Sequence, residues 1–194
     1  MNLLQESLYW ITSGLLIPCI VFLLFMLIQS LMAVGQYFSK RGRLNTGVEQ
    51  LTSWSQQTNV LSQPLPENLK QLSFYPTLAK VLASKDTATS RLLISHFETD
   101  SDKQLSRFSN LAKLGPITGL VGTLIPMGPA LQGLAAGDIA QLAQQMQIAF
   151  TTTVIGLIIG AVGFTLYQIY KRHIFKGLAI LDFVLEKQEL RDEK

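Results

Sequence analysis

Charged residues are scarce in this chain of 194 residues, and three long stretches contain none. Only 15% of the residues are charged, against about 25% in an average soluble domain. Asp, Glu, Lys, Arg and His are all missing from Ser7–Ser39, Leu114–Gly137 and Ile139–Tyr170, which are runs of 33, 24 and 32 residues. A helix of about 20 apolar residues crosses a bilayer, whereas an open strand would leave its backbone unpaired in lipid. The sequence therefore predicts an all-α integral membrane protein with three transmembrane helices.

Other absences exclude further classes of protein. One cysteine, Cys19, cannot build a disulfide scaffold. The two histidines, His96 and His173, have no partner at metal-ligand spacing, and there is neither a Gly-rich phosphate loop nor an HExxH pattern. We therefore expect no enzyme activity, no metal site and no cofactor. The net charge of +3 is small and scattered, so nucleic acid is not an expected partner.

The basic residues predict the orientation of the spans. All 16 Lys and Arg residues lie either between Ser39 and Lys113 or after Tyr170. The positive-inside rule then places the long loop and the tail in the cytoplasm, with the N-terminus and the Asp138 turn outside. The first run lacks a basic leader and exceeds the 7–15 apolar residues of a signal peptide, so we interpret it as a retained anchor.

These patterns divide the chain into six segments. They are an N-terminal segment with the first transmembrane helix (1–38), a cytoplasmic helical loop (39–112), the second transmembrane helix (113–137), a short periplasmic turn (138–145), the third transmembrane helix (146–173) and a cytoplasmic C-terminal helix (174–194). Within the loop, a short helix is expected over 44–57, followed by a break at Pro64, Pro66 and Pro76. Asp86 is the expected start of the next helix.

Small residues form a stripe on the second and on the third predicted span. At about 100° per residue, each stripe falls within about 80° of the helix circumference. The stripes contain Gly115, Gly119 and Gly122 in one span and Gly156, Gly160 and Gly163 in the other. Small faces allow helix backbones to approach closely in lipid. Tight helix packing is therefore expected, either within the chain or between copies.

Threonines are the notable polar side chains of these two spans, and two interpretations remain open for them. In the first interpretation, Thr123 and the run Thr151–Thr153 each donate a hydrogen bond to a carbonyl one turn earlier. Alternatively, Thr123 and Thr153 face a common cleft and line a polar path. No span contains a carboxylate, and proton relay through a bilayer normally needs a titratable group at depth. If the chain moves ions, the titrating side chain belongs to another polypeptide.

Two motifs resemble those of a known family. Gly115-Pro-Ile-Thr-Gly-Leu-Val-Gly-Thr123-Leu resembles the APxxGLxGTV signature in the second membrane helix of the MotA/TolQ/ExbB proton-channel family. Ala149-Phe-Thr-Thr-Thr153-Val-Ile-Gly156-Leu resembles the A-x-x-A-T-A-x-G-L of its third helix. The resemblance covers about 105–173. Three spans and a short loop are similar to ExbB or TolQ rather than to MotA, which has four spans.

The resemblance implies a pentamer whose second and third helices line a central pore. The pore would hold a dimer of ExbD- or TolR-like single-span subunits, each with an intramembrane aspartate that carries protons past the threonines of the pentamer. Thr123 and Thr153 inherit the pore-threonine roles, and Thr152 is a further candidate for the ion pathway. The transported ion is expected to be H⁺, with Na⁺ as the alternative. A TonB-like protein would transmit the work from the inner membrane of a Gram-negative bacterium to outer-membrane transport.

The chain also departs from the family pattern. Pro126 replaces a usual glycine and Pro129 follows, while Ile148 occupies a place where many relatives carry a glutamate. The nearby glutamines, Gln144, Gln145 and Gln147, can hydrate an entrance but cannot ionise. Alternative functions are TolQ-like envelope maintenance, a MotA-like motility stator, and a non-conducting membrane scaffold whose small-residue stripes serve assembly alone.

Overall fold

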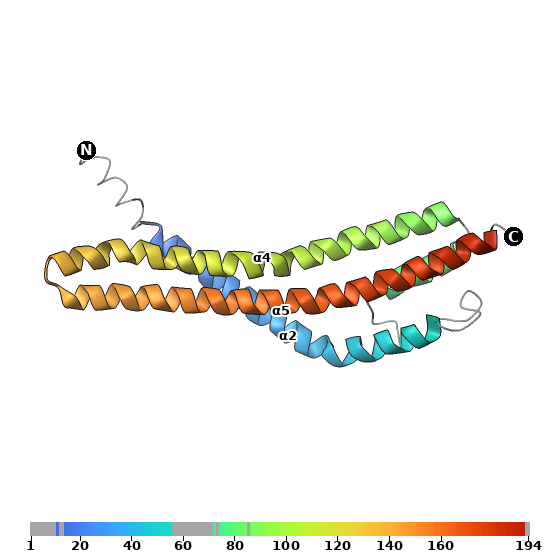
Figure 1. Cartoon of the computed structure of the whole chain (residues 1–194), viewed down its shortest axis with the longest axis horizontal. Coiled ribbons are helices and arrows are strands. Elements are labelled where there is room, and N and C mark those ends of the chain that lie inside the picture. The colour runs from blue at the N-terminus through green and yellow to red at the C-terminus, as the bar shows by residue number, and fades with distance from the viewer. Residues whose placement is uncertain (1–10, 12–13, 56–71, 73, 85, 193–194) are drawn as a thin grey trace. The chain divides into compact units, whose positions relative to one another are not determined.

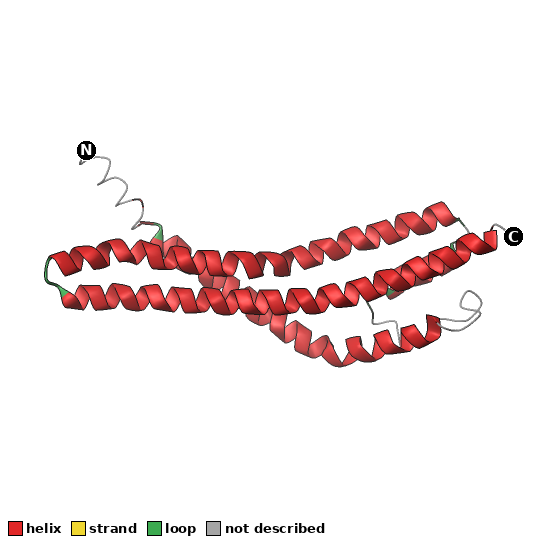
Figure 2. Ribbon diagram, viewed as in Figure 1, coloured by secondary structure: helices red, strands yellow, loops and turns green. Residues whose placement is uncertain are grey.

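The structure is a computed structural model that describes residues 11, 14–55, 72, 74–84 and 86–192. Its helices are α2 (Leu16–Ser55), α3 (Tyr75–Ala83), α4 (Thr87–Ala135) and α5 (Ile139–Asp192) (Figure 1). Figure 2 shows helices and short turns, and the described residues contain no strand. Three of these helices, α2, α4 and α5, are long and apolar enough to cross a membrane. The predicted all-α membrane fold with three candidate spans is confirmed.

The chain divides into two compact units. The first, here called the membrane unit, comprises Met1–Val34 and Phe108–Tyr167. The second, the polar unit, comprises Gly35–Arg107 and Gln168–Lys194. Helices α2, α4 and α5 each contribute one segment to each unit, so none of these helices ends where the composition changes.

Two expectations about the loop are wrong. The helix predicted over 44–57 is not separate, because α2 continues without a break to Ser55. Charge after Ser39 marks a change of solvent and not a helix end, since Lys and Arg are good helix formers. Pro76 does not break a helix but lies in the first turn of α3, where its missing N–H has no helical partner to lose. The other two prolines of the predicted break, Pro64 and Pro66, lie outside the described residues.

Aspartates begin both long helices that follow. The carboxylate of Asp86 accepts hydrogen bonds from the backbone N–H groups of Ala88 and Thr89 at 3.2 and 3.1 Å. It therefore caps α4, as the sequence predicted. The carboxylate of Asp138 accepts from the N–H of Gln141 at 2.9 Å and caps α5 in the same way.

The turn between α4 and α5 is shorter than predicted. It contains residues 136–138 alone, and residues 139–145, which were expected in the turn, already belong to α5. Gly137 adopts a φ of 76°, its N–H donates to the carbonyl of Leu134, and the N–H of Asp138 donates to the carbonyl of Gly133. This bonding pattern ends a helix with a left-handed glycine. Because the cap of α5 follows at once, α4 and α5 form a tight antiparallel hairpin (Figure 1).

The core of the membrane unit brings all three of its helices together. Leu23 and Met26 of α2 pack with Leu111 of α4 and Ile159 of α5. The thiol of Cys19 on α2 also lies 3.7 Å from the carbonyl oxygen of Thr118 on α4, in hydrogen-bonding geometry. Helix α2 is thereby held against one side of the α4–α5 hairpin.

The polar unit has a hydrophobic core of its own. It combines residues of α3, α4, α5 and the segment before α3, namely Leu72, Phe74, Leu78, Val81, Ile94, Ile180, Leu181 and Val184. Gln188 of α5 is buried beside this core, where its side-chain amide donates to the carbonyl of Val81 at 2.8 Å and accepts from the hydroxyl of Ser90. These bonds link the end of α3 to α4 and α5.

Candidate functional site

The two glycine stripes face each other in the contact between α4 and α5. A Cβ added to Gly156 would lie 2.6 Å from the carbonyl oxygen of Gly115 and 2.7 Å from the Cα of Gly119. A Cβ on Gly160 would lie 2.6 Å from the ring of Pro116, and one on Gly163 would lie 2.5 Å from the backbone nitrogen of Ala112. These distances are too short for any side chain. The glycines therefore permit backbone-to-backbone packing within one chain.

The remaining glycine of the stripes, Gly122, lies against a threonine. A Cβ added there would be 2.7 Å from both Cβ and Oγ1 of Thr152. Thr152 is only 5% exposed, and its hydroxyl donates to the carbonyl of Ala149 at 2.9 Å. Thr152 is thus part of the α4–α5 contact.

Three of the four threonines bond back to their own helix. The hydroxyl of Thr123 donates to the carbonyl of Leu120 at 2.6 Å, and that of Thr151 donates to the carbonyl of Gln147 at 2.8 Å. Thr152 does the same, as described above. For these residues the structure follows the first of the two interpretations of membrane threonines.

Thr153 is the exception. Its oxygen is buried and, among the described residues, has no hydrogen-bond partner. A buried hydroxyl without a partner costs about 1–3 kcal/mol, and threonine in a helix has a second χ1 rotamer at little cost. The Cα of Thr153 is also near Gly119, 3.4 Å from the position of an added Cβ. Because the oxygen is buried, a change of χ1 rotamer is required before it can bond to a group outside the described residues.

Thr123 and Thr153 lie on the same side of the α4–α5 contact. On a helical wheel at about 100° per residue, each threonine lies about 50–70° from the centre of the glycine stripe on its own helix. The offset has the same sense on both helices, that of increasing residue number. Because the two helices are antiparallel and their stripes face each other, equal offsets in this sense bring both threonines to the same side of the hairpin. We call this side the threonine face.

Large apolar side chains surround the two threonines on this face. They are Leu120, Met127 and Leu134 of α4 and Phe150, Leu157 and Phe164 of α5, and they are between 39% and 63% exposed. Among the described residues, the contacts of α2 are with the other side of the hairpin. The threonine face is consequently an apolar surface with two threonines near its midline, of which Thr153 has its oxygen turned inward.

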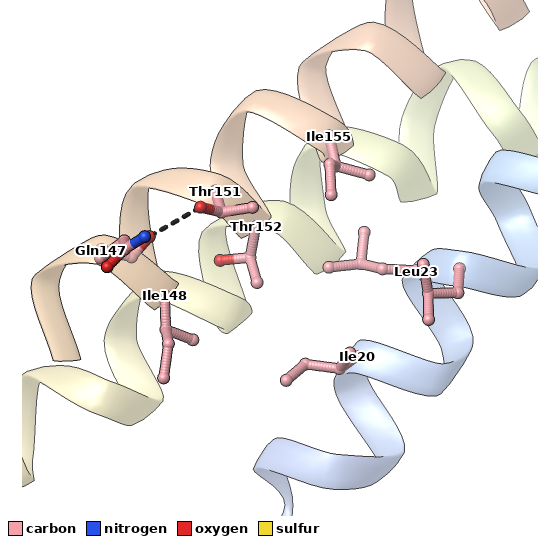
Figure 3. A pocket seen from close by; sticks show the side chains of 8 residues that line it. Ile20, Leu23, Gln147, Ile148, Thr151, Thr152 and Ile155 are labelled. Atoms are coloured by element: carbon pink, nitrogen blue, oxygen red, sulfur yellow. Dashed lines mark hydrogen bonds between the residues drawn. The ribbon is translucent and has the colours of Figure 1, made fainter. Parts of the chain in front are cut away.

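A groove occupies the opposite side, between α2 and α5 (Figure 3). It has a volume of about 270 Å³, and its lining includes Ile20 and Leu23 of α2 with Ile148, Thr151 and Thr152 of α5. Ile148 therefore faces α2 and not the threonine face. The three threonines expected in the ion pathway thus lie on two sides of the hairpin. Thr152 lines this groove, whereas Thr123 and Thr153 lie on the threonine face.

The structure also shows the burial of the prolines and glutamines that the sequence singled out. Pro126 is buried and Pro129 is half-buried, and both lie within an unbroken α4. Gln144 and Gln147 are exposed, and Gln147 borders the groove beside α2. Within the part of the chain that the structure describes, no group of three or more His, Cys, Asp or Glu residues is close enough to hold a metal ion.

The chemical capacity of the site follows from these placements. Hydroxyl groups can donate and accept hydrogen bonds but do not titrate in the physiological range. Sequence reasoning singled out Thr123 and Thr153 but not the orphan oxygen, because the residue type alone does not show which hydroxyl lacks a partner. A comparison of the two helical wheels would have found the common side once an antiparallel hairpin was assumed.

Residues 67–182, more than half of the chain, match the model of the MotA/TolQ/ExbB proton channel family. The match includes the whole of α3 and α4 and both residues of the threonine face that carry hydroxyls. No curated protein and no solved structure is similar enough to count as a match. Members of the family are channel or motor subunits that form oligomeric membrane complexes with partner proteins. This protein is therefore a multi-pass membrane protein that belongs to the MotA/TolQ/ExbB proton channel family.

Proposed function

We propose that the chain is an ExbB/TolQ-like subunit of a proton-driven motor in the inner membrane of a Gram-negative bacterium. Copies of the chain, five by family analogy, surround the membrane helices of an ExbD/TolR-like partner. Proton flow through this complex drives a TonB-like protein and so energises outer-membrane transport.

The absence of acids in the spans supports a division of labour between two polypeptides. α4 has no carboxylate from Leu114 to Gly137, and α5 has none from Ile139 to Tyr170. A proton needs a titratable group to cross the bilayer at these depths. The proposed partner supplies it as an aspartate in a single membrane helix. The chain supplies hydroxyl groups that can stabilise the carboxylate as it gains and loses the proton.

The threonine face has the surface chemistry that such a partner requires. Its exposed apolar side chains, such as Phe150 and Leu157, suit contact with an apolar helix or with a neighbouring copy of the chain. Thr123 and Thr153 are the polar groups between them. Helix α2 packs on the opposite side, so it does not obstruct the approach of a partner to the hairpin.

The observation that carries the proposal is the buried Thr153 oxygen without a partner. In lipid, an unsatisfied polar group has no water to compensate it. A carboxylate or carboxylic acid on a partner helix would supply the missing hydrogen bond. Thr151, two residues earlier, already has its bond to Gln147 and serves as the internal reference.

The experiment replaces Thr153 by Val in the complete complex isolated from its native membrane and reconstituted in liposomes. Loss of a hydrogen bond to a charged group costs about 1.5–3 kcal/mol, so proton flux should fall about 10- to 150-fold while the complex still assembles. Thr153→Ser, which keeps the hydroxyl, should retain most of the flux. Thr151→Val is the matched control and should have little effect.

Two results would contradict the proposal. Unchanged flux in Thr153→Val would remove the pore role of this hydroxyl. Silent Thr123→Val and Thr153→Val substitutions, together with no flux in any complex, would favour a non-conducting scaffold. Flux that requires Na⁺ instead of a pH gradient would retain the motor but change its ion.

Three candidate spans in the described residues favour the ExbB/TolQ layout over the four-span layout of MotA. Co-purification decides between the outputs of such a motor. We expect a single-span protein with an intramembrane aspartate to accompany the chain in mild detergent. Isolation of the chain as a solitary monomer would contradict the assembly.

A further inference from the structure

Three cations share one face of α5 immediately after its charge-free run ends at Tyr170. They line an open groove of about 450 Å³, whose lining among the described residues is Gln168, Lys171, Arg172, Phe175, Lys176 and Ala179. These residues are spaced three or four apart or are direct neighbours, so they fall on one side of the helix. The opposite side of the same segment is buried through Ile174 and Gly177. We call the exposed side the basic face.

The segment of α5 that carries the basic face contains no carboxylate of its own. The helix contains no acid between Ile139 and Leu181, and its first carboxylate is Asp182. Among the described residues, neither Arg172 nor Lys176 forms a salt bridge. Glu189, one of the acidic residues further along α5, is instead paired with Arg91 of α4. Cations and acids are thus separated along the helix.

The basic face lies at the depth of lipid headgroups. A rise of 1.5 Å per residue places Lys176 about 9 Å beyond Tyr170 along the helix axis. The headgroup layer on each side of a bilayer is about 5–8 Å thick, and lysine stems extend back toward it. Tyr167 and Tyr170 precede the cations, and aromatic side chains of this kind mark the membrane–water interface.

The side chains match a phosphate in chemistry as well as in depth. The guanidinium of Arg172 can donate two parallel hydrogen bonds to phosphate oxygens, and the ammonium of Lys176 acts as a point charge. The ammonium of Lys171 lies 5.6 Å above the ring of Phe175, which is 58% exposed. The aromatic ring thus adds an apolar surface beside the cations, as an amphipathic ligand requires.

We propose that the basic face of α5 binds the phosphate headgroup of an anionic phospholipid in the adjoining leaflet. The negative charge of a lipid such as phosphatidylglycerol is complementary to the cations, whereas the ammonium of phosphatidylcholine cancels its own phosphate. The Gln168 amide can donate a further hydrogen bond on the membrane side of the groove. This inference rests on the basic face alone and does not depend on the motor function proposed above.

The experiment measures retained lipid by native mass spectrometry of the full-length complex released from nanodiscs. The nanodiscs contain equal amounts of phosphatidylglycerol and phosphatidylcholine. We expect the wild type to retain phosphatidylglycerol selectively. Each cation removed should reduce this preference about 5-fold, so Lys171→Gln, Arg172→Gln and Lys176→Gln combined should reduce it about 100-fold.

A matched control separates the basic face from net charge. Lys80→Gln, Lys103→Gln and Lys187→Gln remove the same charge from other places in the polar unit and should leave the preference intact. A second control exchanges the cations conservatively, as Lys171→Arg, Arg172→Lys and Lys176→Arg, and should preserve it. Circular dichroism of every variant confirms that the helices are intact.

Three outcomes would overturn the inference. The first is equal retention of the two lipids by the wild type. The second is an unchanged preference in the triple Gln variant, or a similar loss in the control variant. The third is loss of a bound acidic protein, and not of lipid, when the three cations are removed.

Discussion

The membrane unit and the polar unit contain segments of the same helices, α2, α4 and α5, but these segments pack in different ways. In the membrane unit, α4 and α5 meet through glycines, and large side chains such as Leu120 and Ile17 point outward with 59% and 72% exposure. In the polar unit, large side chains are inside, and Leu78, Leu181 and Val184 are fully buried. Small residues therefore form the α4–α5 contact of the membrane unit, whereas large apolar residues form the core of the polar unit.

The difference teaches which force holds each unit together. Burial of a leucine in water contributes about 1.5–3 kcal/mol, so the polar unit gains stability from large apolar residues in its core. Lipid tails are as apolar as leucine, so a similar burial in the membrane unit contributes little. Close backbone approach and van der Waals contact remain as its source of stability. Small residues therefore form the α4–α5 contact of that unit, and larger side chains, Leu23, Met26, Leu111 and Ile159, are buried where α2 joins it.

The most severe test of the comparison is Gly156→Leu in the membrane unit. Its side chain would collide with the carbonyl oxygen of Gly115 and the Cα of Gly119, which are backbone atoms that cannot move aside. We expect the α4–α5 hairpin to fail to close and the folded complex to be lost, measured as recovery of assembled protein in mild detergent. Gly128→Leu is the matched control, because nothing lies within 4 Å of a Cβ at that position. Equal recovery of both variants would contradict the packing role of the glycines.

The next test concerns the large residues of the polar unit. Leu181→Ala should lower the free energy of unfolding of this unit by about 2–5 kcal/mol, because it leaves a cavity at a fully buried site. Denaturant-induced loss of helicity measures the change. Leu190→Ala in the same unit and Leu120→Ala in the membrane unit remove the same atoms from sites that are more than half exposed, and should cost far less. A similar loss of unfolding free energy in Leu120→Ala would contradict this difference between the two units.

A smaller effect is expected where the polar unit buries an amide. Gln188→Leu would leave the Val81 carbonyl and the Ser90 hydroxyl without the bonds they now share with Gln188, and should cost about 1–3 kcal/mol of stability. Gln104→Leu, at an exposed position of α4 in the same unit, is the matched control. Thermal unfolding of the two variants compares them directly, and equal melting temperatures would show that the network adds no stability.

The smallest effect is the pH dependence of the α4 cap. The side-chain hydrogen bond from Thr89, with the backbone bonds from Ala88 and Thr89, lowers the pKa of Asp86 below its usual 3.8. A carboxyl with a lowered pKa contributes stability that is fully present above its unfolded pKa and is lost as the pH falls through its folded pKa. Helicity of the wild type and of Asp86→Asn should therefore differ slightly at neutral pH and converge below about pH 4. A difference that grows on acidification would contradict this sign.

Much of the fold could be predicted because its signals are local. The three spans follow from runs without charge, and the Asp86 cap follows from one side chain and the backbone beside it. The α2 boundary and the length of the Asp138 turn were predicted less well. In both places the sequence changes polarity where the helix does not end, since backbone hydrogen bonds are satisfied in a helix on either side of a membrane surface.

The candidate site was predicted in part for the same reason. The glycine stripes identified which faces of α4 and α5 would be small, and the sequence left open whether they meet within one chain. The sequence singled out Thr153 but did not show that its hydroxyl, unlike those of Thr151 and Thr152, has no partner among the described residues. The difference between them depends on the rotation of α5 about its own axis.

The sequence by itself determined that the chain is helical, membrane-spanning and without an acid in its spans, because these properties depend on composition along one helix. Only the tertiary structure decided that the glycine stripes meet within one chain, that Thr152 and Ile148 lie toward α2, and that, among the described residues, the Thr153 hydroxyl is left without a partner. The physical reason is that helix rotation is set by contacts between distant segments. Here those contacts are the glycine backbones of α4 and α5.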